Sequence, residues 1–253
     1  MKIGIIQGRL SEPLNGFQEC PENWKREFEI LPDIGLSHIE WIVTSNSYKN
    51  NPIFSEDVSS YNISSICADN LVTTDISNWR FLRENLDPIC KSAIANKIPC
   101  VTIPLLEYSN MNDTYPRSQF IDCILQYADN YPTLIFSFEI ESHEDIIDSI
   151  IYLRDNFRLT YDTGNMTSLG INHEYYITKY FDKINNVHLK DRTFEGETVQ
   201  PGTGKTNFKQ VFNILSDLGY DKNYTIQTAR GKDGDEIKTI VEHKNILEGI
   251  YNG

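Results

Sequence analysis

Short runs of β-branched and other apolar residues alternate with longer amphipathic segments from one end of the chain to the other. The short runs predict eight strands, near residues 2–7, 38–43, 63–68, 100–104, 134–141, 158–162, 184–190 and 223–228. Amphipathic spacing predicts helices near residues 22–34, 78–97, 116–130, 143–156, 173–182, 207–218 and 234–250, with the weakest helical signal near 55–61. Strands that alternate with helices indicate a parallel sheet with crossover helices.

The predicted helix near 207–218 shows how clear this pattern is. Its apolar stripe at helical spacing is formed by Phe208, Val211, Phe212, Leu215 and Leu218. Gly219 stands where a left-handed C-terminal cap is expected. For the helix near 143–156, Ser142 followed three residues later by Asp145 resembles a capping box.

Eight strand–helix units in 253 residues favour a closed (β/α)8 TIM barrel, an α/β fold that forms one domain over residues 1–253. An open doubly wound sheet is the alternative, because periodicity does not report whether a sheet closes. The sequence contains no low-complexity tract, linker or repeat that would mark a domain boundary.

Composition and charge indicate which kinds of partner the chain is expected to bind. The net charge of −13 disfavours nucleic-acid binding, because phosphate contacts depend on Lys and Arg. The apolar start of the chain is too short for a signal peptide, and no run approaches the roughly 18 apolar residues of a membrane span. Five scattered cysteines without a C-x-x-C pair are typical of a reducing compartment. We therefore expect a cytoplasmic protein without membrane or nucleic-acid partners.

Four predicted strands in the second half of the chain end in residues able to hold a divalent metal. These are Glu139, Asp162, His188 and Gln227, which are separated by 23, 26 and 39 residues. A barrel of this length spends about 31 residues on each unit, so consecutive strand ends would present these side chains where barrel enzymes keep their chemistry. One nitrogen, two carboxylates and an amide oxygen suit Mn²⁺, Mg²⁺ or Co²⁺ better than Zn²⁺.

The four strand-end segments resemble motifs of the xylose-isomerase-like TIM-barrel superfamily, which includes the sugar phosphate isomerases and epimerases. The most specific are Asp162-Thr163-Gly164-Asn165 and Val187-His188-Leu189-Lys190-Asp191. The resemblance begins at Ile3-Gly4-Ile5-Ile6-Gln7-Gly8-Arg9 and continues through residues 35–42 to residues 227–230. The resemblance covers nearly the whole chain. It implies a metal held by Glu139, Asp162 and His188, with Gln227 in the fourth ligand position.

The resemblance also implies a reaction. The expected function is that of a metal-dependent sugar or sugar-phosphate isomerase or epimerase in carbohydrate metabolism, which transfers a proton next to a carbonyl through a metal-stabilised enediolate. A sugar or inosose-type dehydratase and a non-catalytic carbohydrate-binding barrel are the alternatives. The superfamily also contains apurinic-site endonucleases, which the acidic charge and only five His disfavour. A homo-oligomer is compatible with the sequence.

Two positions depart from the family pattern. Gln227 stands where most members have Glu, and Asn165 stands where many have His. Glutamine can coordinate a metal but cannot accept a proton, which favours a single-base isomerase or a dehydratase over a two-base epimerase. Glu139 and Lys190 are the candidate catalytic residues. Lys190 is a candidate replacement for the lost carboxylate, as is Asp191 beside it. Glu141 points to the same face of its strand as Glu139 and is the fallback ligand or base.

Other polar residues beyond the strand ends are candidates for substrate binding. They are Gln7, Arg9, Glu141, Asn165, Arg192 and Arg230. The three arginines each follow a predicted strand, so together they make a phosphorylated substrate a reasonable expectation.

The glycine-rich segment 201–206 ends in Gly-Lys-Thr but does not match a P-loop. The motif requires Gly five residues before the second glycine, where this chain has Val199. A return loop into the next helix is one interpretation. A phosphate site after the seventh strand is the other, because barrel phosphate sites often use this loop and a helix N-terminus.

Overall fold

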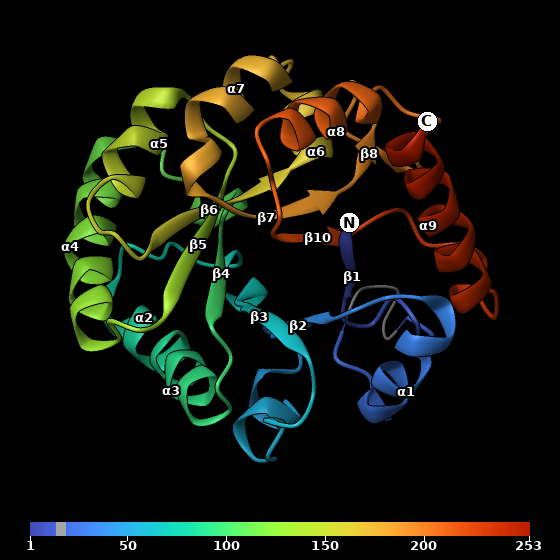
Figure 1. The fold of residues 1–253 in the computed structure, drawn as a ribbon. Coiled ribbons are helices and arrows are strands. Elements are labelled where there is room, and N and C mark those ends of the chain that lie inside the picture. Colours follow the sequence, from blue (N-terminus) through green and yellow to red (C-terminus); the bar gives the residue numbers. More distant parts are fainter. Residues whose placement is uncertain (14–18) are drawn as a thin grey trace. The chain divides into compact units, whose positions relative to one another are not determined.

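The computed structural model describes residues 1–13 and 19–253, in which the predicted strands form a closed barrel (Figure 1). The barrel strands are β1 (Lys2–Ile6), β2 (Ile39–Ile42), β3 (Ile63–Cys67), β4 (Cys100–Leu105), β5 (Ile135–Ile140), β6 (Phe157–Asp162), β7 (Ile184–Leu189) and β10 (Asn223–Ile226). Their order is β1-β10-β7-β6-β5-β4-β3-β2. The TIM-barrel prediction is confirmed, and the open-sheet alternative is wrong.

Helices follow the strands in the order that the amphipathic pattern predicts. They are α1 (Trp24–Ile34), α2 (Trp79–Asn85), α3 (Asp87–Ala95), α4 (Thr114–Asn130), α5 (Glu144–Ile151), α6 (Thr163–Ser168), α7 (His173–Tyr180), α8 (Phe208–Asp217) and α9 (Glu236–Asn252). Gly219 adopts the expected left-handed conformation after α8, with φ of +80°. None of the helices within the described residues is long and apolar enough to cross a membrane.

Some local predictions were wrong. Residues 55–61 form no helix, and short 3-10 turns precede them at Tyr48–Asn50 and Pro52–Phe54. Pro52 starts the second turn with a fixed φ, and the Asn51 side chain accepts a hydrogen bond from the Ile53 N–H. The helix near 78–97 is divided between α2 and α3, where Pro88 lacks the N–H that would continue the backbone ladder.

The helix predicted near 143–156 also differs from the expectation, because α5 already ends at Ile151. The capping box before it is absent. Ser142 instead donates a hydrogen bond to Asn112 at 2.6 Å, and the N-cap of α5 is His143, which makes no side-chain cap hydrogen bond. Ser142 therefore bonds to Asn112, 30 residues away in the chain, and does not cap the helix that follows it.

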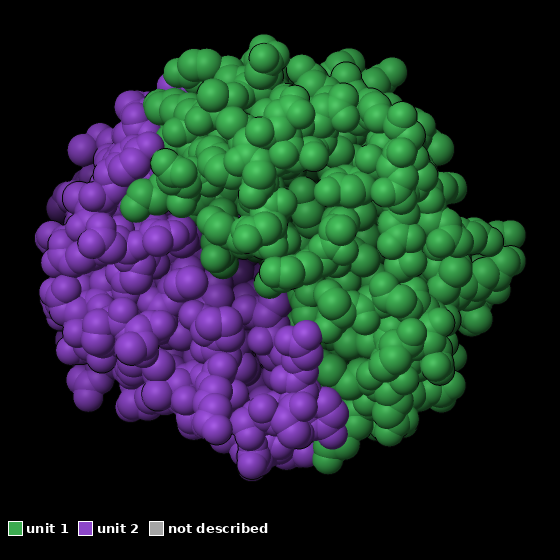
Figure 2. Space-filling model, viewed as in Figure 1, with its two compact units in different colours: residues 1–39, 161–253 green, residues 40–160 purple. Residues whose placement is uncertain are grey.

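Contacts along the chain define two compact units (Figure 2). One unit comprises residues 1–39 and 161–253, and within it β1 pairs with β10 and β10 with β7, all in parallel. The other comprises residues 40–160, in which β4 pairs in parallel with β3 and β5. That the chain behaves as one domain stays a prediction.

Each unit has its own apolar core. In residues 40–160, the rings of Phe138 and Phe157 meet edge to face with centroids 5.1 Å apart, and both are fully buried. In the other unit, Ile5, Leu189 and Ile226 are buried on neighbouring strands. Burying an aliphatic or aromatic side chain of this size contributes about 1.5–3 kcal/mol, so these strands hold the polar ends that follow them in fixed positions.

Candidate functional site

Asp162 is the last residue of β6 and also the N-cap of α6. Its backbone is extended, and its Oδ1 accepts a hydrogen bond from the Asn165 N–H at 2.8 Å. Aspartate favours this position because its side chain satisfies an N–H that has no partner within the helix. The cap occupies Oδ1 and leaves Oδ2 for contacts outside the helix.

Two nitrogen-bearing side chains from the end of β7 lie close to this oxygen. Lys190 Nζ is 2.7 Å from Asp162 Oδ2, and His188 Nδ1 is 4.0 Å from it. Burial by itself raises the pKa of the Asp162 carboxyl, but Lys190, His188 and the Asn165 N–H outweigh it and hold that pKa below its ordinary value. Asp162 is therefore an anion at neutral pH, in a site from which water is almost excluded.

Thr163 and Gly164 bring β7 against α6. Thr163 Oγ1 lies 2.7 Å from the Lys190 carbonyl oxygen and accepts a hydrogen bond from the Lys190 N–H at 3.0 Å. A Cβ on Gly164 would lie 2.8 Å from Lys190 Cγ, so a larger residue here would displace the lysine side chain. Asn165 Oδ1 is 3.5 Å from Lys190 Nζ. The sequence motif contains Thr163, but its contact with Lys190 was not predicted, because the two residues are 27 positions apart.

Gln227 follows β10, which lies beside β7 with Thr225 opposite His188. Its N–H donates a hydrogen bond to the Leu189 carbonyl at 3.1 Å. Its side-chain Oε1 is buried and has no hydrogen-bond partner within residues 1–13 and 19–253. A buried acceptor without a partner is rare in proteins, and it is the kind of atom that a bound cation would satisfy.

These residues fit a divalent cation. Asp162, His188 and Gln227 offer a carboxylate oxygen, an imidazole nitrogen and an amide oxygen, a donor set suited to hard or borderline ions. The Lys190 ammonium supplies the positive charge that now balances Asp162. The carboxylate would be shared with, or transferred to, a metal ion when one binds.

The remaining candidate carboxylates belong to residues 40–160. Glu139 is the fifth residue of β5 and is 4% exposed, opposite Pro104 of β4. Glu141 directly follows β5 and is half-buried. Their predicted roles as ligand, base or substrate contact stay predictions.

The loop after β1 is clamped between two charged side chains. Glu27, on α1, accepts hydrogen bonds from the N–H groups of Gly8 (3.0 Å) and Leu10 (3.1 Å) and from the Ser11 hydroxyl (2.9 Å). Arg230 donates to the carbonyls of Gly8 (2.6 Å) and Ser11 (3.2 Å). Arg230 therefore binds backbone in this structure. Glu27 was missed, although a Glu within the apolar stripe of α1 was a signal in the sequence.

The other residues predicted to bind substrate differ in exposure. Gln7 is completely buried directly after β1, whereas Arg9 and Arg192 are half-buried beyond β1 and β7. Asn165 is 1% exposed in the first turn of α6.

The glycine-rich segment 201–206 holds a carboxylate of the chain itself. Asp191 accepts hydrogen bonds from the N–H groups of Gly202 (2.8 Å), Gly204 (2.9 Å) and Thr206 (3.0 Å). The expectation of a substrate phosphate in this loop is therefore wrong, because an internal anion already fills the ring of donors. The segment before it, predicted only as polar loop, contains a two-stranded antiparallel ribbon of β8 (Asp191–Arg192) and β9 (Thr198–Val199).

A second network missed from the sequence lies behind Asp162. His173 Nδ1 forms a short hydrogen bond with the Tyr161 hydroxyl, and its Nε2 is 3.1 Å from Thr167 Oγ1. Thr167 Oγ1 is in turn 3.0 Å from Thr206 Oγ1. Burial lowers the pKa of His173 to about 4, so the imidazole is neutral and joins α6, α7 and the glycine-rich segment.

The chain is similar in sequence and in fold to known proteins. The family model described as xylose isomerase-like TIM barrel matches residues 22–248. The structures of L-ribulose 3-epimerase and of 3-keto-D-glucoside 4-epimerase from E. coli superpose with TM-scores of 0.73 and 0.71, at 14% and 17% identity. The alignments cover 99% and 98% of this chain and 94% and 99% of theirs. At these identities the likeness is one of fold.

Curated sequences match over shorter segments. Inosose dehydratase from Geobacillus thermodenitrificans is 30% identical over 87 residues, which are 27% of this chain and 29% of that protein. Inosose dehydratase from Clostridium tetani is 24% identical over 161 residues, which are 56% of this chain and 44% of that protein. The matches thus span less than half the length of these relatives.

Proposed function

Because the chain belongs to the xylose isomerase-like TIM-barrel family, we propose that it is a metal-dependent sugar or sugar-phosphate isomerase or epimerase, which moves a proton on a carbon next to a carbonyl. The observation that carries the proposal is the buried cluster of Asp162, His188 and Lys190. Directly after the neighbouring strand β10, the buried Oε1 of Gln227 has no hydrogen-bond partner among the described residues.

The proposed metal ligands are Asp162, His188, Gln227 and Glu139. Glu139 is a buried carboxylate near the end of β5, the strand next to β6 in the barrel order, and is chemically suited to complete the set. Mn²⁺, Mg²⁺ or Co²⁺ suits three oxygens and one nitrogen better than Zn²⁺ does. Related structures are described with a zinc atom in one case and with magnesium in another. A bound divalent ion would polarise the substrate carbonyl.

The chain's own residues would handle the proton. Glu139 is the proposed base, because a buried carboxylate near the carbonyl can take a proton from the adjacent carbon. Lys190, fixed by Thr163 and Asn165, would donate a proton or hydrogen bond to a substrate oxygen. Gln227 cannot accept a proton, so one carboxylate base serves one face of the substrate. This favours isomerisation over two-base epimerisation.

A dehydratase is the second candidate function, favoured by the sequence matches to inosose dehydratases. The first step would be the same removal of a proton next to a carbonyl. A hydroxyl on the following carbon would then leave as water, with Lys190 as the acid that protonates it. The two functions differ in product, because dehydration removes one water from the substrate and isomerisation does not.

Proton exchange with the solvent tests the proposal. The protein with Mn²⁺ would be incubated in heavy water with a panel of ketoses, ketose phosphates and inososes, and deuterium at carbon would be read by NMR. We expect exchange by the wild type and its loss in Glu139→Gln. Gln227→Glu, which adds a carboxylate, should retain exchange and extend it to the opposite face.

No exchange by the wild type with any member of the panel would contradict an enzyme of this kind and would favour the carbohydrate-binding barrel. Exchange by Glu139→Gln at the wild-type rate would remove Glu139 as the base and leave Glu141 or Lys190 in its place. Mass spectrometry of the same samples separates the two reactions, because a product lighter by one water identifies the dehydratase.

A further inference from the structure

Arg9 is a half-buried cation for which the described residues provide no ion pair. It lies three residues beyond β1, and its Nε is buried with no hydrogen-bond partner in the described part of the chain. No ion pair joins Arg9 to a described carboxylate. Taking a guanidinium out of water without a counter-charge is costly, so the arrangement calls for a physical reason.

The charges around Arg9 increase this cost. Burial, followed by the charge of Arg230, lowers the pKa of Arg9 to about 10. The pKa of His243, on α9, is lowered by burial and also by the charge of Arg9, although Glu242 opposes both. His243 is therefore neutral at pH 7, and Arg230 is the charged group that repels Arg9. An anion bound here would relieve their mutual repulsion.

Arg230 differs from Arg9, because it has hydrogen-bond acceptors and nearby carboxylates. It donates to the carbonyls of Gly8 and Ser11. Burial lowers the pKa of Arg230, and the nearby charges of Glu27, Glu236 and Asp233 offset part of that effect. The uncompensated charge in this part of the molecule therefore belongs to Arg9.

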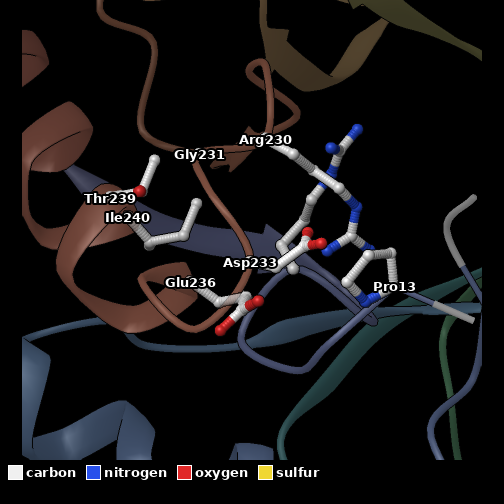
Figure 3. A pocket seen from close by; sticks show the side chains of 8 residues that line it. Pro13, Arg230, Gly231, Asp233, Glu236, Thr239 and Ile240 are labelled. Atoms are coloured by element: carbon white, nitrogen blue, oxygen red, sulfur yellow. The ribbon is translucent and has the colours of Figure 1, made fainter. Parts of the chain in front are cut away.

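Both arginines line a cavity beside the first turn of α9 (Figure 3). Two carboxylates also line it, but neither neutralises Arg9. Glu236 accepts a hydrogen bond from the Gly234 N–H at 2.9 Å, and Asp233 is exposed, so water and salt screen its charge. The cavity therefore combines two guanidinium groups. That of Arg9 has no ion pair with any described carboxylate, and that of Arg230 is fixed by backbone carbonyls.

The cavity lies close in sequence to the strand ends that carry the candidate site. Within residues 1–39 and 161–253, Ile5 of β1 pairs with Ile226 of β10, and Thr225 pairs with His188 of β7. Arg9 and Arg230 each follow the carboxyl end of one of these adjacent strands, as Gln227 does. A ligand held by the arginines would thus begin on the same side of the sheet as the cluster around Asp162.

We propose that Arg9, with Arg230 beside it, binds the anionic group of the substrate, which is therefore a sugar phosphate or a sugar acid and not a neutral sugar. The planar guanidinium pairs with two oxygens of a phosphate or carboxylate at once, which a point charge cannot do. The identity of the substrate rests on the proposed function, whereas the binding of an anion at Arg9 does not.

Direct binding tests the anion site without any need for turnover. Inorganic phosphate and acetate would be titrated separately into the wild type at low ionic strength, with binding read by calorimetry. We expect binding of at least one probe to weaken at least tenfold in Arg9→Gln and less in Arg9→Lys. Arg80→Gln, which removes an exposed arginine of α2, is the charge-matched control and should bind as the wild type does.

Thermal unfolding of the same proteins adds a second measurement that also detects misfolding. Without anion, Arg9→Gln should unfold at the wild-type temperature or above it, because the lost cation had no described partner. With the bound probe, only the wild type and Arg80→Gln should gain stability, as mass action requires. A wild type that binds neither probe, or an Arg9→Gln variant that binds as tightly as the wild type, would overturn the proposal.

Kinetics separates this proposal from the proposed function. With an anionic substrate that the exchange assay identifies, Arg9→Gln should raise KM at least tenfold and change kcat little, because the anion contact is equal in ground and transition states. Exchange with neutral sugars alone would refute the anionic substrate but would not contradict the proposed isomerase or epimerase function. Phosphate binding without any exchange would contradict the proposed function but would support the anion site at Arg9.

Discussion

At the scale of single residues, the candidate site depends on the different contacts made by the two carboxylate oxygens of Asp162. Asp162 uses Oδ1 to cap α6 and presents Oδ2 to Lys190, 2.7 Å away, and to His188. The lysine and a divalent ion would compete for the same oxygen. Lys190 is thus both a candidate acid and the residue that balances the charge when no metal is bound.

Substitution of Lys190 tests this double role. Lys190→Met should tighten Mn²⁺ binding, because the competing ammonium is gone, while turnover falls by about 10²–10⁴-fold if the lysine is a general acid. Mn²⁺ affinity and exchange rate would be measured on the same samples, with Lys209→Met, an exposed lysine of α8, as the control. Weaker Mn²⁺ binding in Lys190→Met would show that the lysine supports the site and does not compete in it.

At the scale of elements, the segment that links β7 to α8 is held from within by Asp191. Its carboxylate accepts from three backbone N–H groups of segment 201–206, while the Lys205 N–H donates to the Arg192 carbonyl at 2.9 Å. Lys190 and Arg192 flank Asp191 in the chain. The loop therefore fixes the backbone on both sides of the aspartate and, through it, the position of Lys190.

Removal of this carboxylate should be reversible by an added anion. Asp191→Ala would leave three converging N–H donors without an acceptor, at a cost of about 1–3 kcal/mol for each group left unsatisfied and buried. We expect a lower midpoint of unfolding and slower exchange, with acetate or formate restoring both in part. Wild type with the same salts is the control. A variant that keeps wild-type stability and activity would contradict the positioning role.

The elements themselves could largely be predicted from the sequence. Strands are buried apolar runs, and α8 repeats its apolar residues at helical spacing, so local pattern and final structure agree. Prediction of 55–61 failed because Asn51 and Pro52 impose a 3-10 turn just before it. The short α6 escaped notice because its six residues carry no apolar stripe, and its start depends on the cap made by Asp162.

The candidate site could be predicted only in part. Spacing and motif located Asp162, His188, Lys190 and Asn165, and the structure brings these four side chains close together. The partners of Asp191 and Glu27 could not be read from periodicity, because their hydrogen bonds join residues 11 to 19 positions apart through folded loops. The phosphate site predicted in segment 201–206 was wrong for the same reason, because Asp191 occupies its N–H groups.

At the scale of the whole molecule, the fold is that of its family, although the sequence identity to the solved sugar epimerases is only 14–17%. The net charge of −13 opposes any general attraction of anions, so an anionic substrate would depend on local cations such as Arg9. The proposed function of the whole molecule therefore depends on whether the polar strand ends form a metal site.

Metal binding to the purified protein measures this most directly. After dialysis against a chelator, Mn²⁺ would be titrated into the protein and free ion followed by electron paramagnetic resonance. We predict one tight site per chain in the wild type, at least a hundredfold weaker binding in His188→Ala, and unchanged binding in His143→Ala, the histidine that precedes α5. A wild type that binds none of Mn²⁺, Mg²⁺, Co²⁺ and Zn²⁺, or a His188→Ala variant that binds Mn²⁺ as tightly as the wild type, would contradict the account.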